Sequence, residues 1–368
     1  MKIVADDRIP YLQGALENFA EVKYIAGAKI NTQDMLDADV LITRTRTQVN
    51  RELLENSSIK LVVTATIGHD HIDKKYLEER GVIWKNCPGC NSGSVATYIA
   101  SLLATMMSDH GFQSKGKTFG LVGCGNVGKR VKKVAEALGM KVLINDPPRA
   151  LAEGKENFCN LETVLNQSDI ISIHVPYIRS GEYKTSALFD DSKLSQMKEG
   201  AWLVNSSRGG IIVENDLEKY LDDNSINAVL DVWENEPNLD LELMKKCKVI
   251  SSHIAGYSVD GKANGTSMSV RHIAEFFDLN LKEWQATNLP LEDKKIQVKE
   301  GELGLVKAIK EAYDIMDDDK KLRCTAENFE INRGQYEAHR DLANYQFIGD
   351  EENCKKLVAM MPEPVIKK

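Results

Sequence analysis

The 368-residue sequence lacks the features of several protein classes. It contains no run of about 18 apolar residues, so it predicts no membrane-spanning helix. It has no excess of positive charge; its formal net charge is −8, which argues against nucleic acid as a default partner. Its start, residues 1–7, reads as a strand followed by acidic residues and not as a signal peptide. We therefore expect a soluble protein of two or three domains, located in the cytoplasm.

The sequence also lacks a disulfide framework. Its seven cysteines are an odd number at scattered spacings, which favours reduced thiols in the cytosol. The C-x-x-C motif at Cys87–Cys90 could be a redox site or a zinc site. No second cysteine pair follows at the spacing of a zinc site, so we favour the interpretation that the motif is a turn before a helix. His69 and His71 could be ligands of a metal site. Turn residues surround them and no further ligands follow, so we expect them to be solvated turn residues that bind no metal. We expect His174 to pack near the cofactor site without taking part in the chemistry.

A glycine-rich stretch organises the middle of the chain. Residues 118–122 form a short apolar run, and Gly123, Gly125 and Gly128 follow it with G-x-G-x-x-G spacing. A helical apolar face begins behind the glycines, and the next apolar run ends at Asp146. A strand, a glycine turn, a helix and an acid in this order predict a dinucleotide-binding site.

Each part of this stretch suits one part of a dinucleotide. Gly123 permits the tight turn, Gly125 lets the pyrophosphate approach the backbone, and the helix behind them offers free N–H groups. Asp146 is placed to accept hydrogen bonds from ribose hydroxyls and to repel a 2′-phosphate, which favours NAD over NADP, and Arg149 is the weaker counter-signal. We therefore expect NAD as the cofactor, bound by Gly123, Gly125, Asn126, Val127, Gly128 and Asp146.

Strands and helices alternate along most of the chain, which predicts parallel sheets covered by helices. We expect an α/β protein with two doubly wound parallel-sheet domains, Rossmann or flavodoxin-like, and a small α+β C-terminal domain. Residues 1–92 and 257–284 should form a substrate-binding (lid) domain, 93–256 an NAD-binding Rossmann domain, and 285–368 the C-terminal domain. Within the first of these domains, the pattern predicts a helix over residues 11–19.

Three polar residues stand at the ends of successive predicted strands in the second domain: Arg208, Glu236 and His253. Such strand ends face the ligand in doubly wound sheets. An arginine can hold a carboxylate, a histidine can take a hydroxyl proton, and a carboxylate can orient that histidine. Each residue taken alone could equally be structural or a surface charge, and it is their coincidence that favours a catalytic set.

Two strand ends in the first domain are also polar. Arg44, Thr45 and Arg46 follow one predicted strand, and the turn at Thr66 follows the next. The arginines could bring positive charge to an anionic substrate, or they could be solvent-exposed charges.

Several motifs resemble one known family. Arg208-Gly-Gly, Asp231-Val-Trp-Glu-Asn-Glu-Pro and His253-Ile-Ala-Gly are similar to motifs of the D-isomer-specific 2-hydroxyacid dehydrogenases, over roughly residues 35–280. The resemblance implies a catalytic set of Arg208, Glu236 and His253, with His253 as the acid/base. It implies further NAD contacts at Val175, Ser206, Ser207, Arg208, Asp231 and Gly256, and substrate contacts at Thr45, Thr66 and Tyr257.

A subgroup of this family matches more closely, through the segments that begin at Cys87, Asn145, Tyr183 and His253. This resemblance implies NAD-dependent oxidation of 4-phospho-D-erythronate to 2-oxo-3-hydroxy-4-phosphobutanoate, on the route to pyridoxal 5′-phosphate. Thr45 departs from the serine usual in the family but keeps the hydroxyl, and Cys87 replaces a small residue. The alternatives are another D-2-hydroxy acid, such as 3-phosphoglycerate, or a regulator that binds NAD(H) without turnover.

The C-terminal segment raises two further hypotheses. The resemblance implies that residues 285–368 form a homodimerisation domain. We expect so small a segment not to bury alone the apolar face made by Leu305, Ala308, Ile309, Ala312 and Ile315. A two-fold partner would bury it. Arg333, Tyr336 and Arg340 follow one another at helical spacing and could lie near an active site, that of the partner included, or form an exposed charged face. The expected ligand is a small phosphorylated hydroxy acid.

Overall fold

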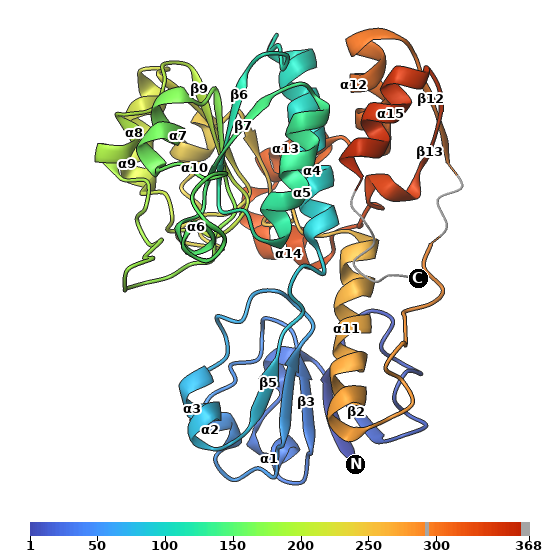
Figure 1. Cartoon of the computed structure of the whole chain (residues 1–368). Coiled ribbons are helices and arrows are strands. Elements are labelled where there is room, and N and C mark those ends of the chain that lie inside the picture. The colour runs from blue at the N-terminus through green and yellow to red at the C-terminus, as the bar shows by residue number, and fades with distance from the viewer. Residues whose placement is uncertain (291–293, 362–368) are drawn as a thin grey trace. The chain divides into compact units, whose positions relative to one another are not determined.

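The structure is a computed structural model that describes residues 1–290 and 294–361. Of these residues, 1–91 and 258–290 form one compact unit, and 92–257 and 294–361 form a second. Figure 1 labels the helices and strands of both units.

The first unit contains a five-stranded sheet of order β2-β1-β3-β4-β5, and every neighbouring pair in it is parallel. Its buried strands read as continuous apolar runs because both faces are covered. The last helix of this unit, α11, follows the second unit in the chain. The elements are β1 (Lys2–Asp6), β2 (Glu21–Ile25), α1 (Thr32–Met35), β3 (Val40–Thr43), α2 (Arg51–Leu54), β4 (Leu61–Thr64), α3 (Lys74–Glu79), β5 (Ile83–Lys85) and α11 (Val259–Phe277).

The helix expected over residues 11–19 is wrong. The structure has turns there, and both Tyr11 and Gly14 adopt positive φ angles, of 63° and 86°, that interrupt a helix. Leu12 and Leu16 are still fully buried, so the apolar pattern recorded burial and not helical periodicity.

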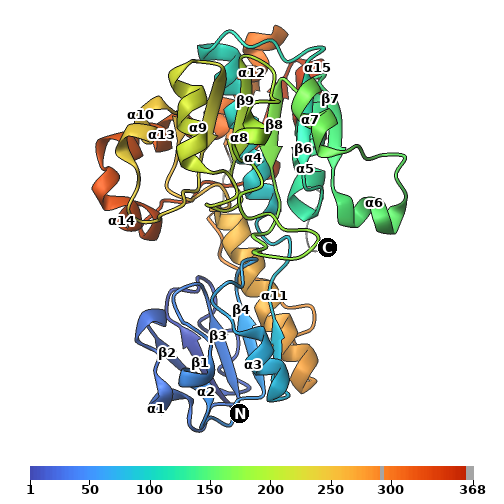
Figure 2. The same ribbon diagram turned by 90° about the vertical axis from the view of Figure 1, so that its left-hand side faces the viewer.

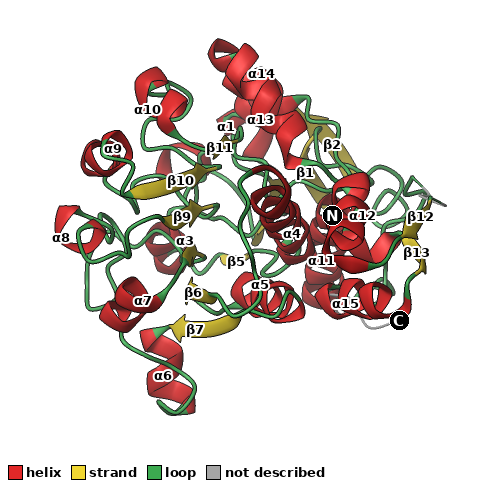
Figure 3. Cartoon of the chain, turned by 90° about the horizontal axis from the view of Figure 1, so that it is seen from above, coloured by secondary structure: helices red, strands yellow, loops and turns green. Residues whose placement is uncertain are grey.

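The second unit contains a six-stranded parallel sheet of order β11-β10-β9-β8-β6-β7. Helices α7, α8 and α9 lie along one face of it (Figure 2), and α4 and α5 lie on the opposite side (Figure 3). Its elements are α4 (Ser92–Asp109), β6 (Thr118–Val122), α5 (Asn126–Ala137), β7 (Lys141–Asn145), α6 (Pro147–Glu153), α7 (Leu161–Gln167), β8 (Ile170–Ile173), α8 (Asp191–Leu194), β9 (Ala201–Asn205), α9 (Glu214–Asp222), β10 (Ile226–Leu230), α10 (Leu241–Lys246) and β11 (Val249–Ile250). The two sheets confirm the predicted fold class.

The C-terminal segment belongs to this second unit. It adds a two-stranded parallel sheet and helices that pack on α4 and α5. Its elements are β12 (Lys295–Val298), α12 (Gly301–Ala312), α13 (Ile315–Cys324), α14 (Phe329–Gly334), β13 (Gln346–Gly349) and α15 (Glu351–Met360). Helices α12 and α13 are separate, because Tyr313 is extended and Asp314 caps the second one by accepting from the N–H of Met316.

The apolar face that the sequence predicted over residues 305–315 is already covered within the chain. Its residues are all buried within the chain, in one cluster with residues of α4 such as Leu102 and Leu103. The argument that this face needs a second copy is therefore wrong, because α4 supplied a surface that the sequence alone did not reveal. The charged-face alternative is wrong for Arg340, whose exposed fraction is 7%. In the described residues, no helix is both long and apolar enough to cross a membrane.

Candidate active site

The glycine turn joins β6 to α5 at the carboxyl end of the six-stranded sheet. Gly123 has a φ of 87°, and a Cβ there would lie 2.5 Å from the carbonyl oxygen of His174 and 2.7 Å from Val175. A Cβ on Gly128 would lie 2.2 Å from the carbonyl oxygen of Gly123, so helix and turn can only pack this closely with glycine. A Cβ on Gly125 would meet nothing within 4 Å, which leaves open space beside the first turn of α5. A pyrophosphate at a helix N-terminus fits this arrangement.

Asp146 stands where the sequence placed it, directly after β7. Its carboxylate accepts hydrogen bonds from the N–H groups of Cys124 (2.8 Å) and Arg149 (3.2 Å), which fix it beside the glycine turn. Arg149 is less available to bind the 2′-phosphate of NADP than the sequence suggested, because its guanidinium is 2.6 Å from a carboxylate oxygen of Glu153 and lies over the ring of Phe158. That ion pair engages the charge that a 2′-phosphate would need.

The loop after β9 carries Ser206, Ser207 and Arg208. Asn205 organises it, because its side chain accepts from the N–H and the hydroxyl of Ser207 and donates to the carbonyl of Arg208 (2.9 Å). The hydroxyl of Ser206 is buried, and among the described residues it has no hydrogen-bond partner. An orphaned hydroxyl in this loop fits a bound cofactor that supplies the missing partner.

This loop is locked against the loop that follows β10. A Cβ on Gly209 would lie 1.9 Å from the carbonyl oxygen of Trp233. Trp233 in turn donates its backbone N–H to a carboxylate oxygen of Glu236 at 3.0 Å. The close approach at Gly209 therefore ties the segment of Arg208 to that of Glu236.

His253 and Glu236 form a directly bonded pair. Nδ1 of His253 lies 2.8 Å from Oε2 of Glu236, and the exposed fractions of the two side chains are 23% and 18%. Burial opposes the ionisation of Glu236, but the hydrogen bond and the charge of His253 outweigh it and hold the pKa of Glu236 below its ordinary value. An ionised Glu236 keeps the proton on Nδ1, so Nε2 is left as the basic nitrogen.

Asp231 builds the turn that presents His253. Its buried carboxylate accepts from the hydroxyl of Ser251 (2.6 Å) and from the N–H groups of Ile254 (2.7 Å) and Ala255 (3.0 Å). These bonds hold His253 at a φ of 56°, a conformation that is rare for a residue with a Cβ. Burial raises the pKa of Asp231 against these hydrogen bonds and the charge of His253. The sequence suggested Asp231 only as a cofactor contact and missed this role.

In the first unit, the predicted substrate residues stand at the carboxyl ends of β3 and β4. Thr45 is exposed in the loop after β3. Thr66 bonds to its own turn, since its hydroxyl lies 2.8 Å from that of Thr64 and donates to the carbonyl of Gly68 at 2.9 Å. The third predicted contact, Tyr257, belongs to the second unit.

A family model and two relatives agree on what the chain resembles. Residues 99–255 match the model described as D-isomer specific 2-hydroxyacid dehydrogenase, NAD binding domain. The erythronate-4-phosphate dehydrogenase of Bacteroides thetaiotaomicron is 42% identical over 351 residues, which cover 95% of this chain and 99% of the relative. That of Pseudomonas fluorescens is 42% identical over 75% of this chain and 73% of the relative.

The chain belongs to the erythronate-4-phosphate dehydrogenases, within the D-isomer-specific 2-hydroxyacid dehydrogenase family.

Solved structures agree on the fold. The NAD⁺-bound 3-phosphoglycerate dehydrogenase of Entamoeba histolytica has a TM-score of 0.64 at 24% identity, covering 79% of this chain and 99% of that one. An NAD-dependent formate dehydrogenase from Staphylococcus aureus in complex with NAD has a TM-score of 0.60 at 23% identity, covering 76% and 96%. The present chain is accordingly an NAD-dependent oxidoreductase of this family.

Other candidate residues raised by the sequence lie within the protein interior. Cys87 and Cys90 are buried, the N–H of Cys90 donates to the carbonyl of Cys87, and burial raises the pKa of the Cys87 thiol to about 12. This confirms the turn before α4.

His71 is buried and not solvated, and burial lowers its pKa to about 4. The described residues hold no group of three His, Cys, Asp or Glu side chains placed to bind a metal. Burial likewise lowers the pKa of His174, to about 3.

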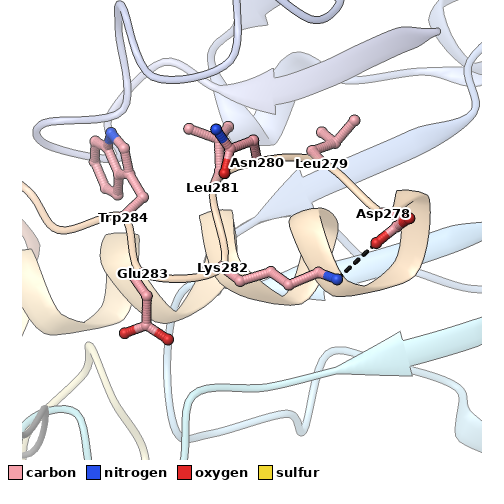
Figure 4. Close-up of a pocket in the computed structure, with 7 residues that line it drawn as sticks. All are labelled: Asp278, Leu279, Asn280, Leu281, Lys282, Glu283 and Trp284. Carbon is pink, nitrogen blue, oxygen red and sulfur yellow. Dashed lines mark hydrogen bonds and ion pairs between the residues drawn. The ribbon is translucent and has the colours of Figure 1, made fainter.

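The structure also has a hollow after α11. It is lined by the consecutive residues 278–284, and Figure 4 shows the Lys282 ammonium paired with Asp278 across it, at 2.6 Å. This loop lies in the first unit and contains none of the predicted site residues.

Proposed function

We propose that this enzyme oxidises 4-phospho-D-erythronate to 2-oxo-3-hydroxy-4-phosphobutanoate. The observation that carries the proposal is the bonded pair of His253 and Glu236 in the same unit as the NAD-binding turn. The names of the two relatives supply the substrate, since both are erythronate-4-phosphate dehydrogenases.

In this proposal each residue has one task. His253 uses Nε2 to take the proton from the C2 hydroxyl, because Nδ1 is held by Glu236. Glu236 stabilises the imidazolium that results. Arg208 holds the substrate carboxylate through its planar fork. NAD⁺, when bound, would supply the hydride acceptor for C2, so that the C2–H and O–H bonds break as the C2 carbonyl forms.

The NAD-binding residues follow the same assignment. The first turn of α5, with Asn126 and Val127, faces the pyrophosphate, and Asp146 receives the ribose hydroxyls. Val175, Gly256 and the serines after β9 complete the site. We further propose that Thr45, Thr66 and Tyr257 contact the substrate. The first unit would then be the substrate-binding domain, and residues 92–257 of the second unit the NAD-binding domain.

We also propose that the enzyme is a cytoplasmic homodimer that acts on the route to pyridoxal 5′-phosphate. The dimer surface would lie on the C-terminal segment, where Leu303, Ile348 and Val358 remain exposed at 61%, 43% and 61%. Light scattering of a Leu303→Glu, Val358→Glu double variant tests this proposal. Both sites are exposed, so the variant should fold as a monomer, and a variant that stays dimeric would contradict the assignment.

A substrate panel tests the function. Wild-type enzyme is assayed for NADH formation with 4-phospho-D-erythronate, D-erythronate and 3-phosphoglycerate, in the presence of a 2-oxo acid acceptor where NADH stays bound. We expect the first compound to give the highest kcat/KM, with NAD preferred over NADP by at least about tenfold. Equal or better turnover of 3-phosphoglycerate would favour the alternative substrate, and NADH binding without turnover of any acid would favour a regulator.

A further inference from the structure

The C-terminal segment touches the candidate active site of its own chain. The guanidinium carbon of Arg333, in α14, lies 5.8 Å from the centroid of the Tyr257 ring. The ring of Tyr336 meets the same tyrosine edge-on at 6.2 Å. Tyr257 follows His253 by four residues, and its N–H donates to the carbonyl of Ile254 at 2.6 Å. Two side chains of the C-terminal segment therefore contact the residue predicted to touch the substrate.

Buried hydrogen bonds fix this part of the segment. The hydroxyls of Tyr313 and Tyr336 both donate to Oδ2 of Asp318, at 2.6 and 3.0 Å. Burial raises the pKa of Asp318 to about 6, against these two bonds. The adjacent Asp319 accepts from the N–H of Ile250, at the end of β11, at 2.8 Å. The segment is thus anchored to the strand that leads into His253.

Arg333 is a positive charge in a largely negative neighbourhood. Its charge acts on Glu236 and favours the carboxylate. Other acidic groups also lie there. Burial raises the pKa of Glu214 to about 7, and the charges of Glu234, Asp240 and Glu236 add to the rise. The charge of His253 opposes the effect of burial on Asp231. Within the described chain, the buried Nε of Arg333 has no hydrogen-bond acceptor.

We propose that Arg333 is a positioning residue for the reaction: it holds Tyr257 in place and supplies positive charge beside the Glu236–His253 pair of its own chain. The C-terminal segment thereby supports the chemistry of each subunit, in addition to any role in assembly. The inference rests on the proposed acid/base pair and needs only a D-2-hydroxy acid that the wild type oxidises.

The test compares pH profiles of kcat/KM for wild type, Arg333→Gln and Arg333→Lys. Loss of the cation makes the protonated imidazole easier to form, so the acid limb of the glutamine variant should move to higher pH, by about half a unit. Its kcat at neutral pH should fall roughly tenfold as Tyr257 loosens. The lysine variant should return the limb to its wild-type position while kcat stays reduced, because an ammonium lacks the planar fork.

Arg323→Gln is the matched control, since it removes one arginine from the same segment. Arg323 bonds to Asp319 and to the carbonyls of Met244 and Cys247, so its loss should lower Tm without moving the acid limb. An unmoved limb in Arg333→Gln, or the same movement in Arg323→Gln, would overturn the proposal. If the glutamine variant does not fold, the lysine variant decides it, because wild-type kcat in that variant would contradict the proposal. A wild type that oxidises none of the panel would instead refute the proposed function.

Discussion

The two parallel sheets hold the residues at their carboxyl ends in different ways. In the six-stranded sheet, the loops after β9, β10 and β11 are locked together through Gly209, Asp231 and the Glu236–His253 pair. In the five-stranded sheet, Thr45 is exposed, and the hydroxyl of Thr66 bonds to the neighbouring Thr64 and Gly68. The difference shows where precision is needed. Proton transfer requires fixed distances, whereas recognition of a polar substrate can be left to an accessible loop.

Removing the base should have the largest effect. His253→Ala should lower turnover roughly 100-fold or more, because the C2 hydroxyl proton loses its acceptor, while NAD binding stays nearly intact. Steady-state kinetics and NAD titration measure the two quantities. Turnover within a few-fold of wild type would show that the locked loops do not carry the acid/base.

Unlocking the loops should come next. Gly209→Ala places a Cβ against the carbonyl oxygen of Trp233, so one of the two loops must move. We expect a loss of about 3 kcal/mol in the free energy of unfolding, together with reduced kcat. Gly125→Ala, measured without cofactor, is the control for stability, because its φ is −73° and its Cβ would meet nothing within 4 Å. Equal stability losses for the two variants would mean that the contact with Trp233 does not lock the loops.

Weakening the pair itself should shift a pH dependence. In Glu236→Gln the imidazolium loses its carboxylate, so the acid limb of kcat/KM should move to lower pH, by about one unit. The pKa of Glu236 is lowered in the folded protein, so its stabilisation is present above the unfolded pKa and is lost as pH falls through the folded pKa. The variant should therefore lose stability near pH 7 and little near pH 3. An unchanged limb would exclude Glu236 from the relay.

The smallest effect should come from the open loop of the first unit. Thr45→Val removes one exposed hydroxyl, so KM for the phosphorylated acid should rise about fivefold, the value of one hydrogen bond, while Tm stays unchanged. Thermal melts and initial rates on the same preparation check both values. A fall in Tm would show that this loop is structural and would weaken the contrast between the sheets.

The sequence revealed the features that depend on short spacing. The glycine turn, Asp146 and the three polar strand ends all follow directly from local patterns, and the two sheets lie where the alternation of strands and helices predicted them. Long-range contacts could not be read in this way. Nothing in the sequence shows that α12 packs on α4, or that Arg333 reaches Tyr257 from about 75 positions away.

The sequence also could not predict the backbone conformation of single residues. Asp231 builds a turn through backbone N–H groups that follow it by more than 20 residues. The apolar residues between Tyr11 and residue 19 are buried without a helix, because the positive φ angles there leave no trace in an apolar pattern. In a short segment, a buried turn and a helix can give the same pattern of apolar residues.

The central claim is that C2 of 4-phospho-D-erythronate gives its hydride to NAD⁺ while His253 takes the proton. It is tested most directly with substrate that carries deuterium at C2, followed by mass spectrometry of the NADH formed. We expect wild-type enzyme to yield NADH heavier by the single transferred deuterium, and His253→Ala to yield almost none in the same time. Unlabelled NADH from the wild type, or equal labelled NADH from the variant, would contradict the account.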